Sequence, residues 1–97
     1  MENYQFKTTF WQDFTIADAF GIPAIRDTYK RAFSEWKSNT KFVTELVLVL
    51  NWKLWQHYEK GNQSVAEVYN ELWQQTHQWC LDNLKDDDLV YYLRTTD

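Results

Sequence analysis

The sequence has few residues that cross-link a small protein or interrupt its helices and strands: one cysteine, two glycines and one proline among 97 residues. A single cysteine excludes an internal disulfide, and the N-terminus lacks the basic start and apolar run of a signal peptide, so we expect a reducing, cytoplasmic location. The scarcity of glycine and proline excludes a long linker or a low-complexity tail. Apolar runs such as Leu46–Leu50 are far shorter than the roughly 20 residues that cross a membrane, so we expect no membrane association.

Aromatic residues are abundant instead, since six Trp, six Tyr and six Phe make up 19% of the chain. Such rings fill the core of a small protein, and Trp and Tyr are also favoured at interfaces. The length predicts one domain over residues 1–97, large enough to bury a core without a metal or a disulfide. The net charge of −4 is unevenly distributed, because residues 1–60 carry +1 and residues 61–97 carry −5.

The stretch from about Thr40 to Lys60 organises the predicted fold, because a helix over these residues is apolar around most of its circumference. Its main stripe at helical spacing consists of Val43, Val47, Leu50, Leu54 and Tyr58. The strip that we expect to meet water runs through Lys41, Glu45, Gln56 and Glu59. A helix of this kind is enclosed by others, so we place it at the centre of the fold.

Amphipathic segments flank this central helix. One runs from Pro23 to about Trp36, and another follows a capping pair formed by Ser64 and Glu67. A shorter segment before Gly21 is predicted to form a lid on the core, the alternative being an exposed patch that needs a partner. The apolar residues of this segment are Phe10, Trp11, Phe14, Ile16 and Phe20.

The predicted fold class is therefore all-α: a compact bundle of four to five helices around a central hydrophobic helix. The last ten residues fit either a helix or a strand, and the acidic start of this segment favours the helix. The first nine residues alternate loosely, so a short two-stranded pairing of the two termini is a further prediction.

Residues for catalysis or metal binding are few. His57, His77 and Cys80 fall one ligand short of a structural zinc site and form no paired motif. Cys80 lies on the apolar side of its helix, where a free cysteine usually acts as a small hydrophobic residue. Both glycines stand alone, which excludes a phosphate-binding loop. We therefore expect no enzyme, no cofactor and no metal, and a thiol enzyme or metal protein using Cys80 would require that thiol to be exposed.

Three surfaces remain for binding. The first is acidic and is either a partner-binding face or simply solvated; its residues are Glu67, Glu71, Asp82, Asp86, Asp87 and Asp88. The second is a basic face for nucleic acid, formed by Arg26, Lys30, Arg31 and Lys37. The third is an apolar strip on the central helix, covered either by the lid or by a second copy across a two-fold axis, and it consists of Leu48, Trp52 and Trp55.

Several phrases in the chain resemble a family of small uncharacterised proteins carried by prophages and conjugative elements of Firmicutes. They are FWQDFTIADAFG, AIRDTYKRAFSEW, TELVLVLNWKLWQHYE, YNELW and YYLRTTD, and together they cover nearly the whole chain. The resemblance implies no catalytic residues. It implies a mobile-element setting, in which small acidic proteins often bind a host or competing machine, including CRISPR effectors.

The leading functional hypothesis is a non-enzymatic protein-binding protein of a phage or mobile element. More specifically, we expect an anti-defence inhibitor of the anti-CRISPR kind. It would occupy a host or competing-element protein, such as a nucleic-acid-binding defence effector, through the acidic C-terminal third. The alternative is a homodimeric regulator that contacts nucleic acid through the basic face of the second helix.

Overall fold

The computed structural model describes residues 4–97, which form five α-helices and, within that range, no strand. The helices are α1 (Phe10–Phe20), α2 (Ile22–Trp36), α3 (Thr40–Glu59), α4 (Gln63–Asn83) and α5 (Asp86–Thr96). The prediction of an all-α bundle is confirmed, and the last ten residues belong to a helix. The predicted strand pairing of the termini is wrong for the described residues, because α5 satisfies its own backbone groups up to Thr96.

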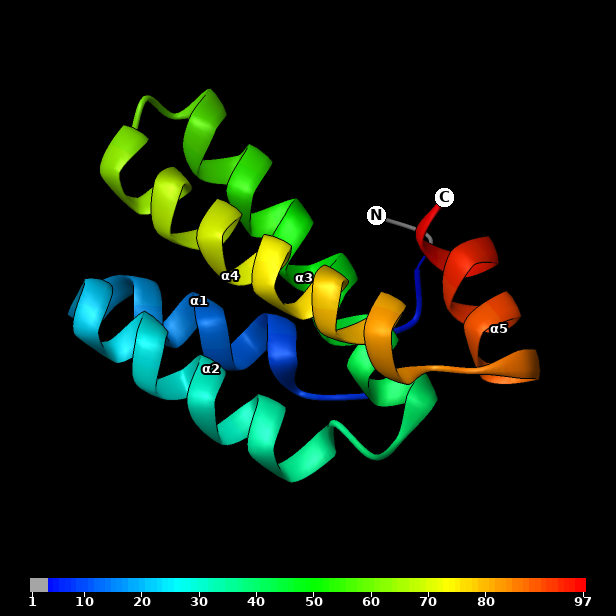
Figure 1. The fold of residues 1–97 in the computed structure, drawn as a ribbon. Coiled ribbons are helices and arrows are strands. Elements are labelled where there is room, and N and C mark those ends of the chain that lie inside the picture. Colours follow the sequence, from blue (N-terminus) through cyan, green and yellow to red (C-terminus); the bar gives the residue numbers. More distant parts are fainter. Residues whose placement is uncertain (1–3) are drawn as a thin grey trace.

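Two antiparallel helix pairs and one short helix make up the bundle (Figure 1). Gly21 joins α1 to α2 with a φ of 106°, and Gly61 follows α3 with a φ of 79°, a region that residues with a Cβ rarely adopt. Helix α5 packs on the N-terminal half of α3 through Tyr92, which lies against Val43 and Val47. Helix α3 contacts all four other helices, as expected for the central element.

The helix ends follow the predictions only in part. The side chain of Asn39 accepts a hydrogen bond from the backbone N–H of Phe42 at 3.2 Å, which caps α3. The predicted capping box of Ser64 and Glu67 is wrong, because α4 begins two residues earlier, at Gln63, with Asn62 as its N-cap. That position has no side-chain cap hydrogen bond.

Aromatic rings that contact one another lie within and around a core that is otherwise mostly aliphatic. Phe14 meets Tyr69 edge to face at 5.8 Å, and Phe33 meets Trp79 in the same way at 5.3 Å. Helix α3 supplies the apolar surface beneath them, as predicted, through the fully buried Leu46, Val49 and Leu50. Tyr58 departs from the predicted stripe, because it lies exposed beside Trp55 at the end of α3.

The predicted lid is correct for only part of α1. Phe10 and Phe14 are buried, whereas Ile16 and Phe20 are 58% and 77% exposed. Residues three or four apart lie on the same face of a helix, and the face of α1 that meets the core carries Phe10, Phe14 and Ala17. Ile16 and Phe20 point to another side and form the exposed patch that was the alternative prediction.

Glu45 was expected to meet water, and this prediction is also wrong, because the residue is completely buried. The N-terminal segment crosses α3 at this point and encloses the carboxylate. Glu45 accepts hydrogen bonds from the backbone N–H groups of Lys7 (2.8 Å) and Thr8 (2.7 Å) and from the hydroxyls of Tyr4 and Thr8. The carboxylate therefore anchors the segment that covers α3.

We predict that Glu45→Ala lowers the free energy of unfolding by about 2 to 4 kcal/mol, because several buried donors lose a charged acceptor. Urea unfolding followed by far-ultraviolet circular dichroism measures this loss. Glu59→Ala is the matched control, since Glu59 is an exposed glutamate near the end of the same helix. An unfolding midpoint of Glu45→Ala equal to that of the control would contradict the anchoring role.

Candidate functional site

Besides the hydrogen bonds around Glu45, two further polar clusters lie inside the bundle, and the first centres on Asp18. Lys53 donates to the Asp18 carboxylate at 3.0 Å, and the Tyr69 hydroxyl donates to it at 2.5 Å. Lys53, which is 1% exposed, also donates to the Thr15 hydroxyl at 2.8 Å and the Gln56 side-chain carbonyl at 3.1 Å. This network joins α1, α3 and α4, and the sequence analysis overlooked it.

His57 completes the Asp18 cluster. Its Nε2 lies 2.9 Å from Asp18 Oδ2 but off the line of a hydrogen bond, and it is a buried atom without a hydrogen-bond partner among the described residues. Its Nδ1 lies 3.2 Å from the side-chain nitrogen of Asn62, and its ring stacks on Tyr69 at 5.5 Å. The imidazole therefore packs as a flat ring between α3 and α4.

Burial alone would raise the pKa of Asp18, but its surroundings reverse the sign. Hydrogen bonds from Tyr69 and Lys53, the adjacent His57 and the charge of Lys53 bring the pKa of this carboxyl below its usual value of 3.8. Desolvation lowers the pKa of Lys53, and the Asp18 carboxylate partly compensates. The pair is a buried ion pair whose members need each other.

The second polar cluster lies where α4 meets α5. His77 Nδ1 is 2.5 Å from the Tyr92 hydroxyl, and the His77 ring stacks on Trp73 at 5.1 Å. Cys80 lies beside Tyr92 and is fully buried. Burial raises the pKa of the Cys80 thiol to about 12, although the Tyr92 hydroxyl partly offsets this effect. A thiol in this state is a poor nucleophile.

The two clusters separate the residues considered for metal binding, because His57 contacts Asp18 whereas His77 contacts Tyr92. Within residues 4–97, no three His, Cys, Asp or Glu side chains are grouped to hold a metal ion. No helix in the same range combines the length and the apolarity needed to cross a membrane.

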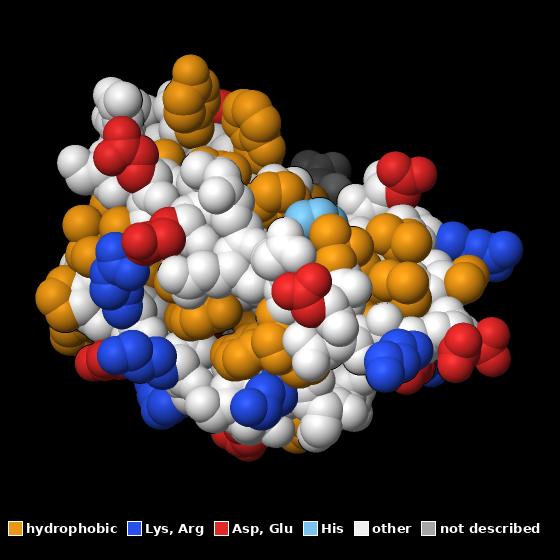
Figure 2. Space-filling view, in the orientation of Figure 1, with side chains coloured by type: hydrophobic (Ala, Val, Ile, Leu, Met, Phe, Trp, Pro, Cys, Tyr) orange, Lys and Arg blue, Asp and Glu red, His pale blue; other side chains and the backbone are white. Residues whose placement is uncertain are grey.

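The acidic residues of the C-terminal third are all exposed, in two groups. Glu67, Glu71 and Asp82 lie along one side of α4, where Glu71 forms a salt bridge of 2.6 Å with Arg26. Asp86, Asp87 and Asp88 form the first turn of α5, where carboxylates stabilise the helix dipole. The face over α4 is mainly uncharged and polar, with acidic side chains standing apart (Figure 2).

Between its acidic ends, this side of α4 carries a shallow hollow of about 640 Å³. Half-buried Trp73 and Trp79 stand at its two edges, Gln74 and Gln78 lie between them, and Asp82 closes one end. We call the exposed side of α4, from Glu67 to Asp82 with these two tryptophans, the α4 surface. Its combination of aromatic edges and polar centre resembles the make-up of protein interfaces.

The predicted basic face of α2 is divided by the structure. Arg26 is paired with Glu71, and Lys37 lies 5.7 Å from the ring centre of Phe33. Arg31 lies on another side of the helix, in the cavity between α1 and α2. Lys30 is exposed to solvent. The four cations therefore do not form one continuous patch.

The apolar strip on α3 is largely covered by the chain itself. Tyr4 and Phe6 pack edge to face on Trp52, at 5.2 and 5.8 Å. Leu48 is half-buried and lines a small cavity beside Trp73 and Thr96. Trp55 alone is exposed, beside Tyr58. The N-terminal segment, rather than α1, supplies most of the cover.

Comparison of the chain with protein-family models, curated protein sequences and solved structures found no match.

We predict that Asp18→Asn lowers the free energy of unfolding at neutral pH by about 3 kcal/mol, because Lys53 is then buried without its counter-charge. The folded-state pKa of Asp18 lies below its ordinary value, so this stabilisation is complete above that value and is lost as the pH falls through the lowered pKa. Urea unfolding from neutral pH to about pH 3 should show the two stability curves converging in acid.

The matched control is Asp27→Asn, an exposed aspartate on α2. Combining Asp18→Asn with Lys53→Met should recover part of the loss, because the unpaired charge is removed as well. A stability gap between Asp18→Asn and the parent protein that is constant across this pH range would contradict the assignment.

We predict that Cys80 does not react with a thiol reagent in the folded protein. With a pKa of about 12, only about one thiol in 10,000 is ionised near pH 8, and the side chain is buried. Labelling should occur at the rate of unfolding and become fast in denaturing urea. Rapid stoichiometric labelling under native conditions would show instead that the thiol is accessible.

Proposed function

We propose that this chain is a non-enzymatic protein-binding protein that engages a basic partner through the α4 surface and the first turn of α5. One observation carries the proposal: a hollow with tryptophan edges lies within an exposed side whose charged residues are all acidic. Partly exposed tryptophans supply apolar contact area, and the carboxylates select a partner of opposite charge.

The state of the reactive groups supports a role without catalysis. Lys53 is enclosed by oxygen atoms and the Trp11 ring, and Cys80 is buried with a raised pKa. Asp18 and His57 face each other inside the bundle. Each of these groups is held in a contact inside the protein, whereas a catalytic group has to reach a substrate.

The biological setting that we propose is a phage or another mobile element, and the partner is a host or competing-element protein. This step rests on the resemblance of segments such as FWQDFTIADAFG and TELVLVLNWKLWQHYE to proteins of prophages and conjugative elements. An acidic surface suits competition for the positive groove of a nucleic-acid-binding defence effector, which makes an anti-CRISPR-like inhibitor the specific form of the proposal.

We predict that Glu67→Lys combined with Asp82→Lys weakens binding to the partner by at least about tenfold, because attraction at both ends of the α4 surface becomes repulsion. Glu71 is left unchanged because of its salt bridge with Arg26. Affinity capture from a bacterial host lysate identifies a stoichiometric partner, and titration with the purified partner at two salt concentrations measures the loss.

The control is Glu59→Lys combined with Asp97→Lys, which changes the net charge equally at two exposed carboxylates outside the α4 surface. Equal weakening by both double variants would show that net charge alone governs binding. The homodimeric regulator would be favoured by three results together: the protein retains only nucleic acid, this binding weakens steeply with salt, and light scattering shows a dimer. The binding residues would then be Arg26, Lys30, Arg31 and Lys37.

A further inference from the structure

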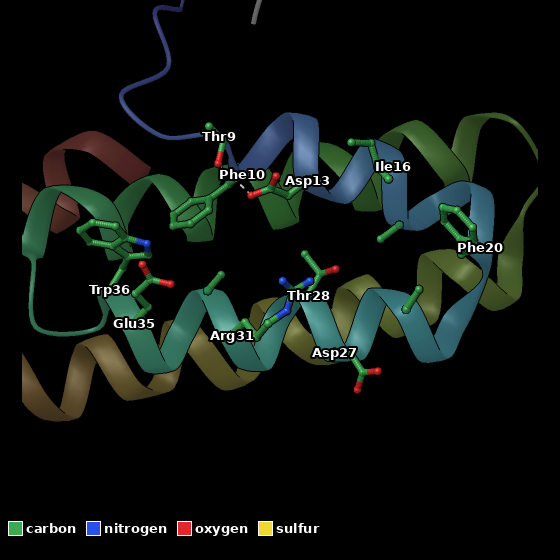
Figure 3. Close-up of a pocket in the computed structure, with 13 residues that line it drawn as sticks. Thr9, Phe10, Asp13, Ile16, Phe20, Asp27, Thr28, Arg31, Glu35 and Trp36 are labelled. Carbon is green, nitrogen blue, oxygen red and sulfur yellow. Dashed lines mark hydrogen bonds between the residues drawn. The ribbon is translucent and has the colours of Figure 1, made fainter.

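A groove of about 510 Å³ runs between α1 and α2, on helices other than those that carry the α4 surface (Figure 3). Four small residues, buried or half-buried, form its floor: Ala17 from α1 and Ala24, Thr28 and Ala32 from α2. The three α2 residues follow one another at intervals of four and so lie in one row along the helix. Small side chains in such a row let another helix approach closely and seat its own ridge of side chains.

Ile16 and Phe20 provide the apolar wall of one half of the groove. They are four residues apart on α1, so they stand one turn above the other, and both are largely exposed. Phe20 is 77% exposed, whereas every other phenylalanine is buried or half-buried. Exposed apolar side chains beside a hollow are typical of a protein contact.

The other half of the groove is acidic and aromatic. Glu35 projects toward it from α2, between the rings of Trp36 and Phe10, and Asp13 projects toward it from α1 on the other side of Phe10 (Figure 3). Arg31 lies in the middle, and Asp27 stands on the outer edge. The lining residues therefore carry three negative charges against one positive charge. None of these carboxylates takes part in a salt bridge within residues 4–97.

We propose that this groove, the α1–α2 groove, binds one basic amphipathic helix of a partner protein. The apolar face of that helix packs on Ile16 and Phe20 above the small residues of the floor. Lysine or arginine side chains at its other end reach Asp13 and Glu35, where the rings of Phe10 and Trp36 also favour a cation.

The length of the groove fits a helix of about three turns. The distance along α2 from Ala24 to Glu35 is about 16 Å, at the usual rise of about 1.5 Å per residue. Asp13 lies three residues from Ile16 and seven from Phe20 on α1, so the first cationic position of the bound helix lies about one to two turns from its apolar positions, and Glu35 would meet a cation further along. An extended peptide has side chains that alternate between two faces, and it would leave the row of small residues poorly filled.

A second copy of this chain is a poor occupant, because a two-fold contact at the groove would bring the carboxylates of both copies together. The proposal does not depend on the α4 surface, which is formed by other residues on another helix. An experiment can therefore disprove binding at the α4 surface without disproving binding at the α1–α2 groove, and the reverse. A variant of either surface serves as the control for the other.

The test is selection from a displayed library of peptides of about 18 residues, the groove length plus about one turn at each end. The peptides share an amphipathic apolar pattern, and their polar positions vary among Lys, Glu and Gln. We expect enrichment of lysine at one end of the selected peptides. Phe20→Glu should weaken their binding by at least about tenfold, because it places a charge on the apolar wall.

Asp13→Lys combined with Glu35→Lys should reverse the preference from lysine to glutamate at the same peptide positions. Glu67→Lys combined with Asp82→Lys should leave binding unchanged, which separates this groove from the α4 surface. All altered side chains are exposed, and circular dichroism checks that each variant keeps its helices.

Three results would overturn the proposal: no enrichment, enrichment without a preference for lysine, or binding that Phe20→Glu leaves intact. Light scattering tests whether a second copy of this chain occupies the groove instead. A dimer of the parent protein that Phe20→Glu dissociates would assign the groove to a second copy and would equally overturn the proposal.

Discussion

The Asp18 carboxylate is the interaction on which the arrangement of the helices depends. It holds α1 against α3 through Lys53 and against α4 through Tyr69. A buried ion pair adds little net stability compared with apolar packing, but it strongly disfavours every arrangement that separates the charges. It therefore fixes the rotation of α1. With Asp18 turned inward, Ile16 and Phe20, each two residues away, are turned outward, so the same contact that orders the interior also creates the apolar wall of the α1–α2 groove.

A second carboxylate, Glu45, holds the N-terminal segment over the part of α3 that the other helices leave uncovered. Helix α3 has apolar residues around most of its circumference, and four neighbouring helices do not cover all of it. The N-terminal segment completes the cover by placing Tyr4 and Phe6 on Trp52. A segment without regular structure leaves backbone N–H groups unpaired, and Glu45 accepts two of them. The buried charge and the irregular segment thus stabilise each other.

The sequence predicted what depends on local periodicity. The central helix, the helices on either side of it and the helix end at Gly21 follow from residue spacing within one segment. The polar contacts could not be predicted in this way, since Glu45 is 37 or more residues from its partners and Asp18 is 35 from Lys53. One signal was available at Lys53, the only Lys, Arg, Asp or Glu between Glu45 and Glu59 in this apolar helix. Whether Ile16 and Phe20 are covered or exposed could not be decided from the sequence, because it depends on the rotation of α1, which Asp18 sets from a distance.

The α4 surface and the α1–α2 groove differ in how they would bind. The α4 surface offers separated carboxylates around two partly covered tryptophans, which favours a fast, charge-guided encounter with a basic protein. The groove offers largely exposed apolar side chains over a floor of small residues, and their burial by a partner would supply lasting affinity. As proposed, both surfaces would repel acidic partners and a second copy of the chain, because carboxylates would meet carboxylates. A partner that presents a basic helix beside a basic surface would satisfy both sites, with charge selecting it and the groove retaining it.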